Sequence, residues 1–425
     1  MSTLRAGPES PQRRPRLLVL ASTFPADVGD GTPAFVADLA RVEATAFDTV
    51  VLAPLVPGGR RQEVREGYEV RRYRFFPRRW EDLADGAILE NLRARPSRWL
   101  QVPTFFLAGA LAVRRAVRDT APDVVHVHWI IPQGLMALLA ARRVPWLVTT
   151  LGGDLYALTS GPARFLKRQV LRRAGAVTVM NQEMQRVVVD LGVPEAKVRV
   201  LPMGVELGRI HRPEDAAPRV SGRVVFVGRL VEKKGVTVLL DALRDLPAGT
   251  DWSLDLIGDG PLRGELEAQA APLGDRVTFH GQLGAGDLGR RLAGAAVAVF
   301  PSVRARSGDQ DGLPVALLEA MAAGTPIVAS DLPGLSDAVA GSSALPDATA
   351  DGPAGGLVEP GDAAALTAAL ARLLGDGALR EGMARAAVQR AAAYSMDAIG
   401  ARYVELLQGA LPTGTAPATA GGNGR

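Results

Sequence analysis

Two carboxylates lie on either side of a predicted helix start in residues 308–326. Asp311 belongs to an acidic, glycine-containing loop, and Glu319 falls in the second turn of the apolar helix that follows. Pro314 fits the first helical position, because the N–H that proline lacks would have no partner there. The free backbone N–H groups and the positive end of the helix dipole between the two acids favour a phosphate. The pattern suits a ligand with a diphosphate in its middle and hydroxyls at both ends, as in a nucleotide sugar.

A second candidate cluster is basic. A buried strand is predicted at residues 223–227, and Arg229 and Lys234 follow it in a glycine-bounded loop. The chain has only four lysines, and two of them are adjacent in this loop. Preplaced cations stabilise the negative charge that develops on a leaving nucleoside diphosphate. The alternative interpretations are a basic surface turn at this loop and a plain buried helix at residues 308–326.

Both stretches resemble motifs of the retaining glycosyltransferases of family 4, which have the GT-B fold. Asp311-x7-Glu319, followed by AMAAGTP, is similar to the family's E-x7-E segment, and residues 228–235 match its G-R-L-x-x-x-K-G. The resemblance implies that Glu319 holds the donor ribose and Asp311 the donor sugar. Asp311 stands where the family has a glutamate and is shorter by one methylene. The implied catalytic residues are Arg229, Lys234 and Asp311, and the implied donor-binding residues are Gly31, Arg229, Lys234, Asp311, Gly312, Leu313 and Glu319.

Loops that follow predicted strands in the first half match the same family. Gly31 corresponds to the second glycine of the family's N-terminal glycine loop, and Asp30 stands where the first glycine often is. The family has H-G-x-D where this chain has LGGD at residues 151–154. Gly152 and Asp154 are therefore candidate cleft residues, although the family's histidine near the donor sugar is replaced by leucine. An aspartate after glycines is also a common helix cap, which is the alternative role for Asp154.

Two histidines share one face of a predicted strand at residues 123–129. His126 and His128 are two positions apart, so their side chains point the same way. The spacing would allow a metal pair, but no third ligand is apparent near it in the sequence, and hydrogen bonding at a strand end is the favoured interpretation. The run HVHWIIPQG resembles the family's strand and loop that open on the cleft. His128 is therefore a further candidate cleft residue.

Strands and helices alternate through both halves, which predicts an α/β protein with two doubly wound, Rossmann-like domains facing a cleft. At 425 residues the chain is also too long for one ordinary core. The expected organisation is a disordered start at 1–15, an acceptor-side domain at 16–205, a linker at 206–221, a donor-binding domain at 222–394, a helix at 395–410 that packs back on the first domain, and a disordered tail at 411–425.

Charge is distributed unevenly along the chain. Residues 1–212 hold 31 Lys and Arg against 20 Asp and Glu, whereas residues 213–425 hold 18 against 25. Two domains with different partners are expected from this asymmetry. The basic half lacks a recognised nucleic-acid-binding motif with interleaved aromatics, so we expect an anionic membrane surface or an anionic acceptor as its partner and no nucleic acid.

Residues 71–99 combine arginines with aromatic residues, namely Arg71, Arg72, Arg74, Arg78, Arg79, Arg93, Arg95 and Arg98 with Phe75, Phe76, Trp80 and Trp99. Two interpretations stay open: a membrane-interfacial surface, or a solvated insertion whose aromatics are core. The apolar run at 102–113 is too short to cross a bilayer as a helix, and the run at 17–21 is too short for a signal peptide. The expected location is cytoplasmic, peripheral on the inner face of the cell membrane.

Taken with the resemblance, these features predict a glycosyltransferase that moves a sugar from a nucleotide-diphosphate sugar to an acceptor hydroxyl, with retention, in glycolipid or polysaccharide biosynthesis. No cofactor or metal is expected, since the nucleotide sugar is a substrate. The chain lacks a G-x-G-x-x-G fingerprint after its first strands and a P-loop, which argues against a dehydrogenase or an NTPase. It also lacks cysteine, so disulfides, thiolate metal sites and thiolate nucleophiles are not available. The alternatives are an enzyme for a small soluble acceptor, such as an aminocyclitol or inositol phosphate, and a catalytically impaired nucleotide-sugar-binding protein.

Overall fold

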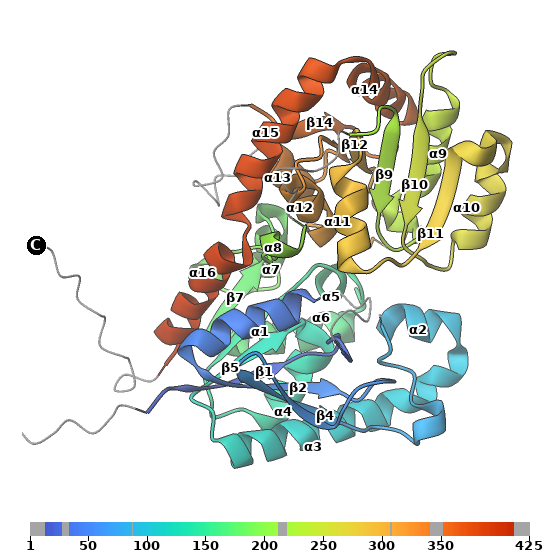
Figure 1. The fold of residues 1–425 in the computed structure, drawn as a ribbon. Helices are drawn as coiled ribbons and strands as arrows, with labels where there is room; N and C mark the ends of the chain where they lie inside the picture. Colours follow the sequence, from blue (N-terminus) through green and yellow to red (C-terminus); the bar gives the residue numbers. More distant parts are fainter. Residues whose placement is uncertain are drawn as a thin grey trace, which may run out of the picture.

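Two parallel β-sheets, stacked one above the other and covered by helices, make up the computed structural model (Figure 1). It describes residues 13–27, 34–86, 88–210, 219–306, 308–340 and 352–411. Gly31 and Asp30, much of the expected linker and most of both expected disordered ends lie outside the described residues. Two doubly wound α/β domains were expected, and this expectation is confirmed.

The first sheet has eight strands in the order β3-β4-β2-β1-β5-β6-β7-β8. All neighbours are parallel except the edge pair β3 and β4. Its central strands are nearly continuous apolar runs, as expected for parallel strands with helices on both faces. The strands are β1 Arg16–Leu20, β2 Asp48–Pro54, β3 Gln62–Arg65, β4 Tyr68–Tyr73, β5 Val124–His128, β6 Trp146–Thr149, β7 Ala176–Val179 and β8 Val198–Val200.

Helices cover both faces of the first sheet. Helix α1 (Phe35–Ala46) packs against α16 (Met396–Gly409), whereas α3 (Val102–Thr120) packs against α4 (Leu135–Ala140), which in turn packs against α6 (Gly161–Arg173). In Figure 1, α1 lies above the strands and α3 and α4 lie below them. The shorter helices of this half are α2 Ile88–Ala94, α5 Gly153–Tyr156, α7 Gln182–Asp190 and α8 Leu207–Ile210.

The second sheet has six parallel strands in the order β11-β10-β9-β12-β13-β14. Its first strand in the chain, β9, sits in the interior of the sheet, so the loops after β9 and β12 meet at one edge. The strands are β9 Arg223–Val227, β10 Ser253–Ile257, β11 Val277–Gly281, β12 Val297–Phe300, β13 Ile327–Ser330 and β14 Gly355–Val358. The helices are α9 Val236–Arg244, α10 Arg263–Ala270, α11 Ala285–Ala293, α12 Val315–Ala322, α13 Pro333–Ala340, α14 Ala363–Gly375 and α15 Gly377–Ala393.

The chain crosses between the two sheets in both directions at one place. Val205, near the end of the first half, donates its N–H to the Tyr394 carbonyl and accepts from the Met396 N–H, both at 2.8 Å. Gly204 is needed for this approach, because a Cβ at that position would lie 2.8 Å from Met396 Cα. After this crossing, α16 runs along the first sheet, as Figure 1 shows in red.

A buried polar network ties α16 to the first sheet. Tyr403 donates to the Leu201 carbonyl at 3.1 Å and stacks on the His126 ring with centroids 5.5 Å apart. His126 Nδ1 lies 2.6 Å from Glu43 Oε1, and its Nε2 lies 2.7 Å from Thr149 Oγ1. Burial raises the pKa of Glu43 well above its ordinary value and lowers the pKa of His126 to about 3. Both shifts disfavour the charged form of the side chain, as expected for groups that are buried away from solvent.

Helix α3 is longer than the apolar run in its sequence suggested. Together with the preceding turn η2 (Pro96–Gln101) it forms a 25-residue helical segment, and among the described residues this is the one segment long and apolar enough to cross a membrane. The expectation that the run is too short was therefore wrong, because helical structure continues on both sides of it. Only 28% of its most apolar window is buried, and it packs on the sheet through Phe105, Gly109, Val113 and Ala116.

Candidate active site

The loop between β9 and α9 brings two lysines to the edge of the second sheet. It contains the 3₁₀ turn η5 (Glu232–Lys234) and ends at Gly235, whose φ is +63°. A Cβ at Gly235 would lie 1.8 Å from the Pro301 carbonyl oxygen. Glycine is therefore required here twice, by its left-handed backbone and by the close approach. The result is that η5 lies against the loop that follows β12.

Lys234 and Asp311 form a buried ion pair at this edge. Lys234 Nζ lies 2.9 Å from Asp311 Oδ2, and the same oxygen accepts from Ser302 Oγ at 2.7 Å. Lys233 Nζ lies 3.8 Å from Asp311 Oδ1 and 3.2 Å from Asp309 Oδ2. Asp311 is only 8% exposed. Burial by itself would raise its pKa, but the two ammonium groups and the hydrogen bonds from Lys234 and Ser302 outweigh burial and hold the pKa below its ordinary value.

Helix α12 begins directly after this pair. Pro314 is the N-cap, with φ −67° and ψ 126°, so the first helical residue is Val315, one later than the sequence suggested. No side chain caps this N-terminus. The uncapped helix start comes four residues after Asp311, which pairs with Lys234, and uncapped backbone N–H groups near a lysine favour an anion. Glu319, in the second turn, is half-buried.

The first half of the chain meets the donor-side loop at Gly312. Gly152, with φ +103°, comes so close that a Cβ there would lie 3.5 Å from Gly312 N. Asn181 Nδ2 donates to the Gly312 carbonyl at 3.1 Å. A Cβ at Gly334 would lie only 1.4 Å from that carbonyl oxygen, so the position has no room for a side chain. The structure thus brings together Gly152, Lys234 and the adjacent residues Asp311 and Gly312 from three separate segments.

A second contact between the halves lies beside Gly312. Glu183, at the start of α7, accepts from Gln310 Nε2 at 2.9 Å and lies 3.3 Å from Arg304 Nη2. Arg229 also points across, since a Cβ at Gly86 would lie 3.9 Å from its Nη1. The donor-side loops are therefore held against the first half by polar contacts.

Asp154 accepts hydrogen bonds from two neighbouring loops. It accepts from the Ile130 N–H at 2.7 Å, from Thr150 Oγ1 at 2.8 Å and from the Leu151 N–H at 3.2 Å. Burial raises its pKa, and these hydrogen bonds oppose the rise. It does not cap α5, whose N-cap is Gly152 without a side-chain bond. Asp154 instead ties the loop after β5 to the loop after β6.

The other candidates differ in their surroundings. His128 is fully buried, its ring lies 4.2 Å from that of His126, and neither nitrogen has a hydrogen-bond partner among the described residues. Burial, with a smaller contribution from His126, lowers the pKa of His128 well below its ordinary value. Leu313 is half-buried and packs on the core. The roles assigned to these residues from the sequence stay predictions.

Four residues near the site were not predicted from the sequence. Ser302, Asp309, Asn181 and Glu183 reach the site only through tertiary contacts. Ser302 had a signal, since it follows the end of a buried strand, where parallel sheets place ligand-binding residues. Asn181 had one as well, because it precedes a helical pattern and indeed caps α7 by accepting from the Met184 N–H at 2.9 Å.

Comparison with known proteins gives a consistent assignment. Residues 221–376 match the family model described as Glycosyl transferases group 1, and residues 30–204 match the Glycosyl transferase 4-like domain. The chain is 32% identical over 312 residues to the phosphatidyl-myo-inositol mannosyltransferase of Mycobacterium leprae, covering 71% of this chain and 78% of the relative. This chain belongs to the group 1 glycosyltransferases. The family assignment made from the sequence is therefore confirmed, whereas the roles given to single residues at 228–235 and 308–326 stay predictions.

Other members of the family extend the comparison. The 2-deoxystreptamine glucosyltransferase of Streptomyces kanamyceticus is 30% identical over 69% of this chain and 79% of its own. Two further glycosyltransferases match over only 58% and 45% of their own length. Among solved structures, the sucrose-phosphate synthase of Thermosynechococcus elongatus superposes with a TM-score of 0.72 at 23% identity, over 92% of this chain and 98% of that one. That likeness establishes the GT-B fold of this glycosyltransferase.

Proposed function

We propose that this glycosyltransferase moves a sugar from a nucleoside diphosphate sugar to an acceptor hydroxyl in glycolipid or polysaccharide biosynthesis, with retention at the anomeric carbon. The observation that carries the proposal is the Lys234–Asp311 pair at the uncapped start of α12, opposite Gly152. The diphosphate would lie between the lysine loop and the helix N-terminus. The ribose would then reach Glu319, one turn further along α12.

The ion pair is compatible with donor binding and with the bond cleavage that follows. An ammonium has three N–H donors, so Lys234 can keep Asp311 and still donate to a phosphate oxygen. As the sugar–phosphate bond breaks, negative charge grows on the diphosphate, and Arg229 and Lys234 stabilise that charge. In the retaining reaction proposed here, the acceptor hydroxyl attacks from the face the diphosphate leaves. Its proton passes to the departing phosphate.

We propose that the reaction needs no bound metal, because Arg229, Lys234 and Lys233 supply the positive charge that a metal would bring to a diphosphate. Turnover should then persist in excess EDTA. Loss of turnover that added Mg²⁺ or Mn²⁺ restores would overturn this part. Retention is tested by NMR of the product, in which the new anomeric linkage should have the configuration of the donor.

The acceptor that we propose is lipid-linked, and the protein would act at the cytoplasmic membrane surface. Support comes from the relative named for phosphatidyl-myo-inositol and from the basic first half of the chain. A small soluble acceptor is the second candidate, because another relative of similar identity is named for 2-deoxystreptamine. Product formation with lipid extracts and with soluble aminocyclitols, measured side by side, separates the two.

Donor binding is the first experiment. In a thermal shift assay, the Tm of the protein should rise with one class among UDP-, GDP- and ADP-sugars, since ligands that bind only the folded state raise Tm. The preferred donor should also be hydrolysed slowly without acceptor. If no nucleotide sugar shifts Tm, the site has been placed wrongly. Binding without hydrolysis or transfer would favour a catalytically impaired binding protein.

A further inference from the structure

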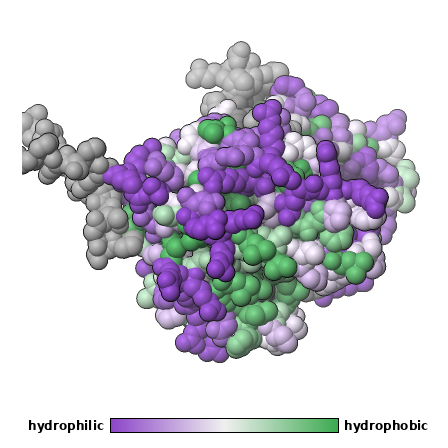
Figure 2. Space-filling model, turned by 90° about the horizontal axis from the view of Figure 1, so that it is seen from below, coloured by the Kyte–Doolittle hydropathy of each residue, from purple (hydrophilic) through white to green (hydrophobic). Residues whose placement is uncertain are grey.

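An apolar surface lies on the helices below the first sheet. Six of the large hydrophobic side chains that are exposed belong to helices that contact one another in turn, namely Trp99 and Leu100 of η2, Leu107 and Leu111 of α3, Leu139 of α4 and Phe165 of α6. Their exposed fractions range from 53% to 74%. Seen from below, the molecule shows hydrophobic residues gathered in one area with hydrophilic residues around it (Figure 2). We call these six residues the apolar face.

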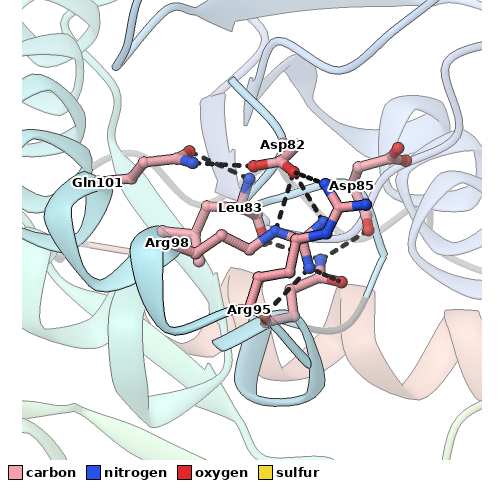
Figure 3. A network of polar contacts seen from close by, with 7 residues as sticks. Asp82, Leu83, Asp85, Arg95, Arg98 and Gln101 are labelled. Atoms are coloured by element: carbon pink, nitrogen blue, oxygen red, sulfur yellow. Dashed lines mark hydrogen bonds and ion pairs between the residues drawn. The ribbon is translucent and has the colours of Figure 1, made fainter. Parts of the chain in front are cut away.

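A polar network holds the tip of this face in place (Figure 3). Arg98 donates to Asp82 Oδ2 through Nη2 at 2.7 Å and through Nε at 2.9 Å, and Gln101 Nε2 donates to Asp82 Oδ1 at 2.8 Å. Gln101 Oε1 in turn accepts from the Leu83 N–H at 3.2 Å. Arg98 and Gln101 thus point inward from η2. Trp99 and Leu100, which lie between them in sequence, are left exposed at 58% and 74%.

Positive charge borders the apolar face. Helix α3 ends with three arginines against one aspartate, and α6 carries four arginines with no acidic residue, whereas its single lysine, Lys167, is buried. Between α4 and α6 lies a cavity of about 520 Å³ lined by Leu138, Arg142, Gln169, Arg172 and Arg173. Arg173 donates to the Arg142 carbonyl, and no ion pair to a carboxylate is found for the three cavity arginines among the described residues. Their charges remain available to an anion.

The arginines of residues 71–98 differ in this respect. Five of the eight have carboxylate partners: Arg71 with Glu69, Arg72 with Glu63, Arg74 with Glu81, and Arg95 and Arg98 with Asp82. Phe75 is buried, whereas Trp80 and Trp99 are exposed. The segment is therefore partly core and partly surface. Five of its eight positive charges are thus paired within the fold, and the arginines of α3 and α6 add further positive charge to the first half.

We propose that the apolar face docks this enzyme onto an anionic phospholipid bilayer, with Arg142, Arg172 and Arg173 receiving a lipid phosphate. The inference deepens the proposed membrane location and rests on it. Exposed apolar side chains beside unpaired arginines match the acyl boundary and the headgroup layer of such a surface. Helix α3 lies in the interface rather than across it, because its other side packs on the sheet.

The test uses the full chain with vesicles of phosphatidylcholine alone and of phosphatidylcholine with phosphatidylglycerol. The wild type should float with the anionic vesicles only, and raised salt should reduce the bound fraction. Leu107→Ser with Leu111→Ser, and separately Arg142→Glu with Arg172→Glu, should each weaken binding about tenfold or more. Val64→Ser, an exposed apolar residue on β3, and Arg385→Glu on α15 are the matched controls and should bind as the wild type does.

The fluorescence of Trp99 gives a second readout, which is measured on the wild-type protein and so does not depend on whether a variant folds. Its fluorescence should shift to shorter wavelength on anionic vesicles, and the shift should be lost in Trp99→Phe while flotation largely remains. Nucleoside diphosphate affinity, measured without vesicles, should be unchanged in every variant, which separates this inference from the proposed function. Equal binding of the paired variants and their controls would overturn it. So would a dimer that the leucine pair dissociates without any loss of vesicle binding.

Discussion

Lys234 Nζ lies 2.9 Å from Asp311 Oδ2, although the two residues are 77 positions apart in the chain. The pair joins the loop after β9 to the start of α12, the two elements between which we place the donor diphosphate. Both side chains are well shielded, with 15% and 8% of their surfaces exposed. A charge at such a site depends on its partner, so the pair has consequences for stability as well as for catalysis.

Replacing the lysine should therefore have two effects. Arg229→Ala and Lys234→Ala should each lower kcat/KM by on the order of a hundredfold or more, because a preorganised charge contact to the leaving diphosphate is lost. Lys234→Ala should also lower the free energy of unfolding by on the order of 2–3 kcal/mol, because Asp311 is left buried with only the more distant Lys233. Lys234→Ala with Asp311→Asn should recover stability without recovering activity. Near-wild-type turnover in both single variants would mean that the donor site lies elsewhere.

Substitutions of Glu319 and Asp311 should have different effects on ligand binding. Glu319→Gln should weaken the binding of free nucleoside diphosphate, since the proposed ribose contact exists without any sugar. Asp311→Asn should leave that affinity nearly intact and reduce turnover of the complete donor. Isothermal titration with the diphosphate, followed by steady-state kinetics with the nucleotide sugar, provides the comparison. Equal losses of diphosphate affinity would contradict the assignment.

Glu183 connects the halves through Gln310 and Arg304. Glu183→Ala removes the carboxylate that Gln310 and Arg304 contact, so the donor-side loop loses these two contacts with α7. We expect kcat to fall by about tenfold with little change in nucleoside diphosphate affinity, because the diphosphate contacts lie on one side of the cleft. Glu195→Ala, which changes an exposed acid on the same half, is the control. A variant that transfers sugar at the wild-type rate would show that this contact is dispensable.

Lys167 predicts a pH dependence of stability. It is buried and donates to the carbonyls of Leu155 and Ala157. Burial lowers its pKa from 10.5 to about 8. The folded state thus binds fewer protons than the unfolded state between these values, and its contribution to stability grows as pH rises from 8 to 10.5. The difference in Tm between the wild type and Lys167→Met should accordingly increase in favour of the wild type over this range. A constant difference would contradict the lowered pKa.

The fold and the donor-side motifs could be predicted from the sequence because their signals are local. The alternation of apolar strands with helical patterns indicates two doubly wound domains, and β9 and the start of α12 lie within a residue of where the pattern places them. Gly235 is also explained locally, because its backbone has a positive φ of 63°, which glycine adopts without strain. Such features depend on neighbours a few residues away, which the sequence shows directly.

Partners that are distant in the chain could not be predicted in this way. The sequence indicated Lys234 and Asp311 as separate ligand contacts, whereas only the tertiary structure decided that they pair with each other and with Ser302. It also decided that Asp154 joins two loops, and that five of the eight arginines of residues 71–98 are paired with carboxylates within the fold. Charge count and residue type are properties of the sequence. Burial and pairing, which set the pKa and the availability of each charge, arise only when the sheets bring remote segments together.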